Sequence, residues 1–119
     1  MKTVKEAKEI YQKQCSYYSV LEDWCQQNDT ALRETMSEED YTKLQKAFKS
    51  AVLTEEFPNE LSEGIDLIND LNDVIQYALD VLYIYNGELK EQTRDDWEEI
   101  ESLNQATDEE TLLGEYLNN

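Results

Sequence analysis

Hydrophobic residues recur at helical spacing from the start of the chain. The first set is Val4, Ala7, Tyr11, Tyr18, Leu21 and Cys25. Steps of three, four and seven residues place these side chains on one face of an α-helix. Thr3 and Glu6 form a capping box at the start of this set, in which each side chain satisfies a free backbone N–H group. The pattern predicts a helix over residues 3–27.

Two further apolar patterns predict helices over residues 37–54 and 59–86. The first begins at the capping pair Ser37 and Asp40, and it ends before Pro58 because proline disfavours helix at the residue that precedes it. Its apolar face consists of Tyr41, Leu44, Phe48, Ala51 and Val52. The second carries apolar residues on most of its sides, which is typical of a helix in the middle of a bundle or in a homodimer.

The ends of the longest predicted helix carry their own signals. Asn59 is a good N-cap, and Gly87 is the residue type that most often stops a helix in the left-handed conformation. Between the first two helices, residues 30–36 are compatible with one short helical turn.

Two more capping pairs lie further along the chain: Thr93 with Asp96, and Thr107 with Glu110. They predict a fourth helix over residues 93–105 and a short C-terminal helix over residues 107–117. No segment shows the alternating pattern of a strand. The predicted fold is therefore all-α: one helical-bundle domain over residues 1–119, with four main helices and one short terminal helix.

Composition indicates a folded protein without a membrane segment. The chain of 119 residues suits one domain, and its hydrophobic content is 39%, with eight Tyr and two Trp. No apolar run approaches the roughly 18 residues that span a bilayer, and the start lacks the apolar middle of a signal peptide. We expect a cytoplasmic protein with no membrane partner. Cys15 and Cys25 would lie about 15 Å apart along one helix, too far for a disulfide, so we expect reduced, partly buried thiols.

Negative charge is concentrated in the second half of the chain. Residues 1–50 hold nine acidic and eight basic residues, a net charge of −1, whereas residues 51–119 hold nineteen acidic and two basic residues, a net charge of −17. No basic residue lies between Lys49 and Lys90. A solvated surface that keeps the protein soluble would explain the total charge. The segregation of sign instead favours a surface directed at a basic partner.

The predicted helix over residues 59–86 carries a line of carboxylates. This acidic row consists of Glu63, Asp66, Asp70, Asp73 and Asp80. Like charges at such spacing destabilise an isolated helix by roughly 0.2–0.5 kcal/mol per pair, and no Lys or Arg within the helix offsets them. The helix dipole favours acidic residues in a first turn, but it does not explain carboxylates in the helix interior. The acidic row is therefore our main candidate for a binding surface.

Three further carboxylates and one aromatic residue extend the candidate surface. Asp95, Glu98 and Glu99 lie on the next predicted helix and would form a second line of charge if the two helices packed together. Tyr77 lies off the main apolar rows of its helix, and tyrosine is enriched at the energetic centres of protein interfaces. We include all four residues as candidate partner-binding residues.

The residues expected of an active site are absent or isolated. The chain has no His, its two Cys cannot complete a four-ligand zinc site, and none of its three Gly lies in a phosphate-binding loop. Glu60, Glu63, Asp70 and Asp73 resemble the magnesium-binding carboxylates of the all-helical MazG-type nucleotide pyrophosphohydrolases. The doubled Glu of that family is missing, however, and all four residues lie on one predicted helix. We predict no enzymatic activity, no cofactor and no metal site.

The acidic row suggests imitation of nucleic acid. It has one charge per roughly 6 Å, compared with one per ~3.4 Å along a DNA strand. In composition, residues 55–115 resemble the loose class of small acidic inhibitors from phages and mobile elements, which includes anti-restriction and anti-CRISPR proteins, although they share no motif with it. We predict a non-enzymatic inhibitor that blocks the basic nucleic-acid-binding site of a partner protein and does not itself bind nucleic acid. Two alternatives remain open: an immunity or antitoxin-like protein that neutralises one toxin, and a dimerising structural module.

Overall fold

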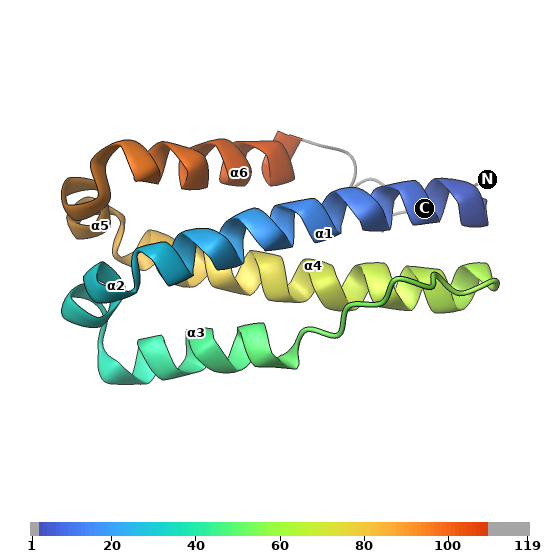
Figure 1. Cartoon of the computed structure of the whole chain (residues 1–119), viewed down its shortest axis with the longest axis horizontal. Helices are drawn as coiled ribbons and strands as arrows, with labels where there is room; N and C mark the ends of the chain where they lie inside the picture. The colour runs from blue at the N-terminus through green and yellow to red at the C-terminus, as the bar shows by residue number, and fades with distance from the viewer. Residues whose placement is uncertain (1–2, 110–119) are drawn as a thin grey trace.

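The computed structural model describes residues 3–109, and all regular secondary structure in this range is helical (Figure 1). The elements are α1 (Val4–Gln27), α2 (Asp29–Thr35), α3 (Glu38–Ser50), α4 (Leu61–Ile84), α5 (Asn86–Thr93), the 3-10 turn η1 (Arg94–Asp96) and α6 (Trp97–Glu109). The predicted all-α fold is confirmed. None of the helices within residues 3–109 is long and apolar enough to cross a membrane.

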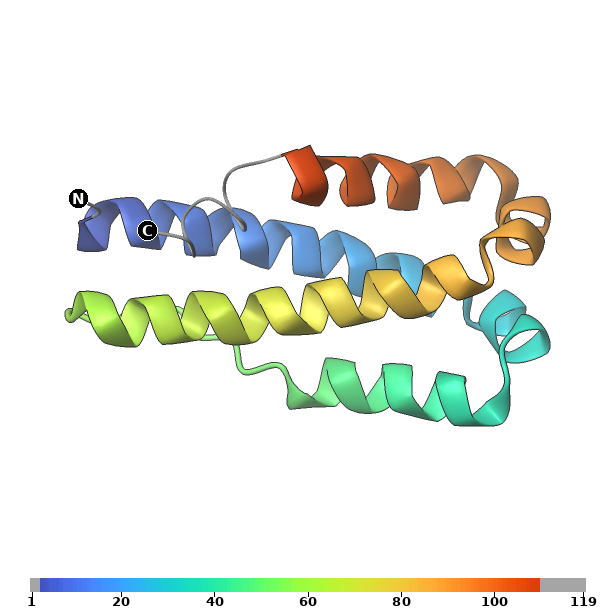
Figure 2. The same ribbon diagram turned by 180° about the vertical axis from the view of Figure 1, so that it is seen from behind.

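Four long helices lie side by side in the order α6, α1, α4, α3 (Figures 1 and 2). Helices α1 and α4 run parallel and form the central pair, whereas α6 runs antiparallel to α1 and α3 runs antiparallel to α4. The short helices α2 and α5 contact each other and close one end of the bundle. Helices α1 and α3 cover two sides of α4, and no other long helix packs along its remaining side, which is open to solvent.

The central pair buries the apolar faces that the sequence patterns predicted. Fully buried residues on these two faces include Ala7, Leu21, Ile68, Ile75, Leu79 and Leu82. One polar side chain lies among them: Gln14 is completely buried, and its Nε2 donates a hydrogen bond of 3.4 Å to the carbonyl of Ile68. Both cysteines are free thiols, with Cys25 buried and Cys15 half-buried, as predicted.

Two tryptophans fix α6 onto the central pair. The Trp24 and Trp97 rings meet edge to face at 5.8 Å, and both side chains are almost fully buried. The indole Nε1 of Trp24 donates a 2.7 Å hydrogen bond to the carbonyl of Asp96. On the other side of Trp97, the Tyr83 ring lies 5.4 Å away. These contacts place the start of α6 against the C-terminal ends of α1 and α4.

Of the four predicted capping residues, Thr3 and Ser37 are confirmed, whereas Thr93 and Thr107 are not helix caps. The Thr3 hydroxyl accepts from the backbone N–H of Glu6, and Ser37 accepts from that of Asp40. Thr93, however, ends α5 instead of starting a helix, and its buried hydroxyl donates to the carbonyl of Leu89. The predicted helices left residues 87–92 as a connection, whereas these residues belong to α5, which packs against α2.

The predicted C-terminal helix begins inside α6. Thr107 does not cap a new helix, because α6 continues through it to Glu109 and its hydroxyl donates to the carbonyl of Asn104. Residues 110–117 of that predicted helix lie outside the described residues. Gly87 was also misjudged: it lies within α5, and its φ is not positive. The chain turns instead at Tyr85, whose backbone N–H bonds to the Leu82 carbonyl.

The connection between α3 and α4 is longer than predicted. Helix α3 ends at Ser50, four residues before the predicted end at residue 54, and Glu60 takes the N-cap position expected for Asn59. Contacts with α1 hold this segment extended, because the Thr54 N–H donates to the Tyr11 hydroxyl. The ring of Phe57 packs 5.5 Å from that of Tyr11 and also lies over Gly64.

The same glycine-to-alanine substitution should have opposite effects in two helices. A Cβ at Gly64 would lie 2.5 Å from the Phe57 ring, whereas a Cβ at Gly87 would meet nothing within 4 Å. Alanine gains about 1 kcal/mol over glycine in a helix, but overpacking costs about 1–3 kcal/mol. We expect Gly87→Ala to raise the free energy of unfolding by about 0.5–1 kcal/mol, and Gly64→Ala to lower it by about 1 kcal/mol.

Urea unfolding followed by circular dichroism measures both changes. A Phe57→Ala background supplies the control, because removal of the ring should turn Gly64→Ala from destabilising to stabilising. If Gly64→Ala is equally harmful with and without the ring, steric contact with Phe57 is not the cause.

Arg94 adopts a backbone conformation that suits glycine. It has φ 47° and ψ −113°, and it is the only non-glycine residue with positive φ among residues 3–109. This conformation matches the first central position of a type II′ turn, and such strain costs about 1–3 kcal/mol. We expect Arg94→Gly to raise the free energy of unfolding by about 1 kcal/mol. Arg94→Ala removes the same charge but keeps the strain, so thermal denaturation should show no comparable gain for that variant.

Candidate functional site

The structure places the whole acidic row on the open side of α4. All five carboxylates (Glu63, Asp66, Asp70, Asp73 and Asp80) are exposed. The opposite side of the helix is buried, with Ile68, Ile75 and Leu79 fully inaccessible to solvent. Figure 2 views the molecule from the side on which α4 lies in front of α1. The row therefore faces away from the central interface along most of the length of α4.

No described residue neutralises the acidic row. The ion pairs among residues 3–109 are Arg33 with Asp29, Lys43 with Glu39, and Lys90 with Glu101. Lys43 on α3 interacts electrostatically with Tyr77 of α4. Its Nζ lies 2.9 Å from Glu39, and this partner, followed by weaker effects that include Tyr77, raises the pKa of Lys43 above its ordinary value. The ammonium group of Lys43 is thus already paired with the Glu39 carboxylate on the same helix.

Two apolar side chains are interleaved with the carboxylates. Tyr77 is 39% exposed and lies four residues after Asp73 and three before Asp80, so it falls within the row. Ile84, which the sequence analysis did not select, is 68% exposed and extends the same line four residues beyond Asp80. Its spacing of four residues from Asp80, which places it on the face of the acidic row, was the signal that could have identified it. The surface therefore combines negative charge with exposed aromatic and aliphatic groups.

The second line of carboxylates does not lie beside the first. Asp95, Glu98 and Glu99 are exposed, but they belong to η1 and α6, which lies along α1. Helix α4 meets α6 at one end, where Tyr83 contacts Trp97. Along the rest of the stack α1 separates the two helices (Figure 1). The expected double row of charge is therefore replaced by two acidic surfaces on non-adjacent helices.

A hollow of about 270 Å³ opens beside the middle of the acidic row. Its lining consists of Ser50, Val52, Leu67, Asp70, Leu71, Asp73 and Val74. Val52 follows the end of α3 and is 73% exposed, so it forms the rim of the hollow. The sequence analysis placed Val52 on the buried face of a longer helix. Its actual exposure follows from the early end of α3 at Ser50.

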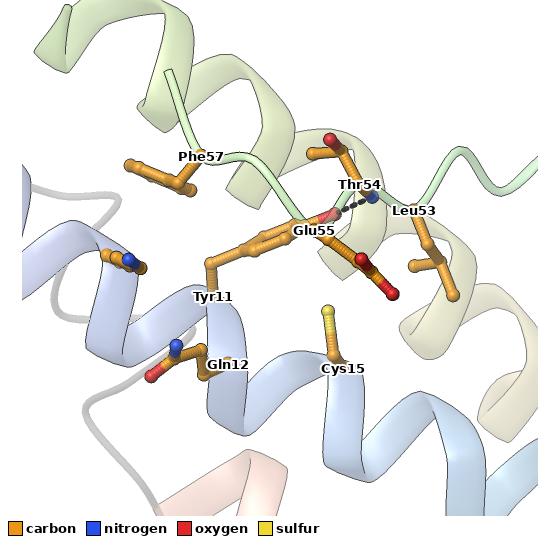
Figure 3. Close-up of a pocket in the computed structure, with 8 residues that line it drawn as sticks. Tyr11, Gln12, Cys15, Leu53, Thr54, Glu55 and Phe57 are labelled. Atoms are coloured by element: carbon orange, nitrogen blue, oxygen red, sulfur yellow. Dashed lines mark hydrogen bonds between the residues drawn. The ribbon is translucent and has the colours of Figure 1, made fainter. Parts of the chain in front are cut away.

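A larger hollow of about 590 Å³ lies between α1 and the connection from α3 to α4 (Figure 3). Its walls include the rings of Tyr11 and Phe57, and the sulfur of Cys15 points into it. Burial raises the pKa of the Cys15 thiol, although a hydrogen bond with Tyr11 opposes this effect. A thiol with a raised pKa remains protonated near neutral pH and is a weak nucleophile. The hollow therefore offers packing space without an activated group.

The carboxylates of the row do not converge on a point. Successive members are three to seven residues apart along a straight helix, a rise of about 4.5–10 Å. Among residues 3–109, no group of three or more Asp, Glu, Cys or His side chains is arranged to hold a metal ion. The row is thus a linear array of carboxylates and not a convergent site.

Comparison of the chain with protein-family profiles, with characterised proteins and with solved structures gives no match.

The buried thiol of Cys25 should make the fold sensitive to alkali. Burial, followed by the nearby carboxylates of Glu22 and Asp29, raises the pKa of Cys25 from an ordinary value of 9.0 to about 12. Above pH ~9 the unfolded chain loses this proton while the folded chain keeps it, so stability falls as pH rises from about 9 to 12. Under reducing conditions, the free energy of unfolding should decline less steeply with pH for Cys25→Ala than for the wild type. Parallel pH profiles for the two proteins would contradict this assignment.

Proposed function

We propose that this protein is a non-enzymatic inhibitor that binds the basic nucleic-acid-binding surface of another protein through the acidic row of α4. One observation carries the proposal: five exposed carboxylates lie in line on an open helix side, and no described cation pairs with them. Lys and Arg side chains of a partner would relieve the mutual repulsion within the row. Nucleic acid, by contrast, would be repelled by a chain of net charge −18.

The charge spacing supports competition with a nucleic acid strand. The row extends over about 25 Å, and its charge density lies within about a factor of two of that along one DNA strand. Because the α6 carboxylates face a different part of the surface, the row imitates one strand and not a duplex. A groove that grips a single strand is therefore the best-matched target. This function would place the protein in the cytoplasm with such partners.

The apolar members of the row favour a dedicated protein partner over general cation binding. Tyr77 and Ile84 lie along the same line as the carboxylates and are exposed. Tyrosine is enriched at binding hot spots, and exposed apolar groups add affinity that salt does not screen. This mixture supports a second candidate function, an immunity-like protein that covers the active surface of one basic toxin. A homodimer through this side is disfavoured because two acidic rows would face each other.

The experiment is affinity capture from a lysate of the source organism with three immobilised proteins. The first is the wild type, and the second carries Asp66→Asn, Asp70→Asn and Asp73→Asn. The third, the matched control, carries Glu9→Gln, Asp23→Asn and Glu34→Gln, which neutralise exposed carboxylates on α1 and α2. Both variants have the same net charge, −18 + 3 = −15.

We expect the wild type and the control to retain nucleic-acid-binding proteins at about 50 mM salt and to release them at about 500 mM. Added DNA or RNA should displace the same proteins, and the α4 variant should lose most of them. Retention that is equal for all three proteins, or that nucleic acid cannot displace, would count against the proposal. Capture of a single toxin that is displaced by its substrate would favour the immunity-like function.

A further inference from the structure

We propose that the hollow beside Asp70 and Asp73 receives one apolar side chain from a cationic segment of the partner protein. This inference rests on the proposed function and adds a specific anchor to it. It predicts that the partner segment carries a leucine-like or aromatic residue between basic residues.

The hollow exists because α3 is shorter than the helix on which it packs. Helix α3 has 13 residues and α4 has 24. The chain leaves α3 at Ser50 and crosses towards α1, where Thr54 and Phe57 contact Tyr11. One flank of α4 is therefore left uncovered beyond the end of α3 (Figure 1).

The lining divides into an apolar part and a charged edge. Leu71 is almost fully buried, Leu67 and Val74 are half-buried, and Val52 projects at the rim. Asp70 and Asp73 border the hollow from the acidic row and make no ion pair with a described residue. An apolar group in this hollow would therefore lie directly beside two unmatched negative charges.

The size of the hollow suits one side chain better than a free small molecule. Its volume is about 270 Å³, whereas ligand pockets usually measure roughly 300–1,000 Å³. A cavity of ~150 Å³ already accommodates a benzene ring. A leucine or phenylalanine side chain thus fits, with room for water at the open edge.

Charge determines which kind of molecule supplies that side chain. A second copy of this chain would bring its own net charge of −18 to the same edge, and a nucleic acid would bring phosphates. A segment with Lys or Arg on either side of its apolar residue places positive charge at Asp70 and Asp73 as the apolar group enters. On a helical segment these basic residues would lie three or four positions from the anchor.

Two synthetic helical peptides test this assignment. Both carry two arginines on each side of a central residue, which is leucine in one peptide and serine in the other. Isothermal titration at about 50 mM salt compares their dissociation constants for the wild type and three variants. Val52→Ser removes the apolar rim, Val20→Ser removes an exposed valine on α1 as the matched control, and Asp70→Asn removes one bordering charge. Val52 and Val20 are 73% and 41% exposed, so neither change should disturb the fold.

We expect the wild type and Val20→Ser to bind the leucine peptide about tenfold more tightly than the serine peptide. In Val52→Ser this preference should fall to about threefold or less. Asp70→Asn should weaken both peptides by a similar factor and leave the preference intact, because it removes charge and not apolar contact.

Three outcomes would overturn the inference in different ways. Equal binding of the two peptides to the wild type would show that the row acts through charge alone, and the proposed function would stand without the anchor. A leucine preference that Val52→Ser does not reduce would place the anchor elsewhere. If neither peptide binds, or if Val52→Ser instead converts a dimer to a monomer in light scattering, the hollow does not receive a cationic segment.

Discussion

The parallel pairing of α1 and α4 is the contact on which the rest of the structure depends. These two helices are the longest, with 24 residues each, and both α3 and α6 pack onto the pair from opposite sides. Hydrophobic burial along this interface is the main favourable contribution to the fold. Repulsion between like charges on one helix costs roughly 0.2–0.5 kcal/mol per pair. The free energy gained from tertiary packing is larger, so α4 can carry five carboxylates on its outer side.

The same pairing separates the two acidic surfaces of the molecule. Because α1 takes both α4 and α6 as neighbours, the carboxylates of α4 and those of η1 and α6 end on helices that do not adjoin. The acidic surface of α4 is therefore narrow and follows one helix. The apolar groups Tyr77 and Ile84 lie within that line and convert it from a simple line of charge into a mixed surface.

Helix faces could be predicted from the sequence because apolar periodicity reports directly on burial. The members of the acidic row, which their spacing predicted to share one helix face, accordingly all lie on the exposed side of α4, and Ala7, Tyr11 and Leu21 of the first predicted apolar face are buried. The errors arose where a local pattern competed with tertiary contacts. Thr93 is followed by Asp96 at capping distance, yet packing of α5 against α2 buries it within the preceding helix.

The hollow lay beyond sequence reasoning because it depends on the relative lengths of two packed helices. The early end of α3 is set by the contacts of Thr54 and Phe57 with Tyr11, which are more than 40 residues apart in the chain. No pattern within residues 37–60 indicates those contacts. Because α3 stops at Ser50, Val52 lies outside the helix and at the rim of the hollow instead of in the core.

The aromatic contacts of Trp97 give the bundle two unequal ends. At the end closed by α2 and α5, Trp24, Trp97 and Tyr83 interlock, and the Tyr85 hydroxyl donates to the Asp40 carboxylate. At the other end, none of residues 51–60 is buried. Local opening requires the least free energy where few apolar groups are buried, so backbone amides should exchange with solvent fastest around residues 51–60. The surface near Tyr77 and Ile84 should consequently be rigid and that at the hollow more compliant, so that a side chain bound there as proposed would also order the chain around it.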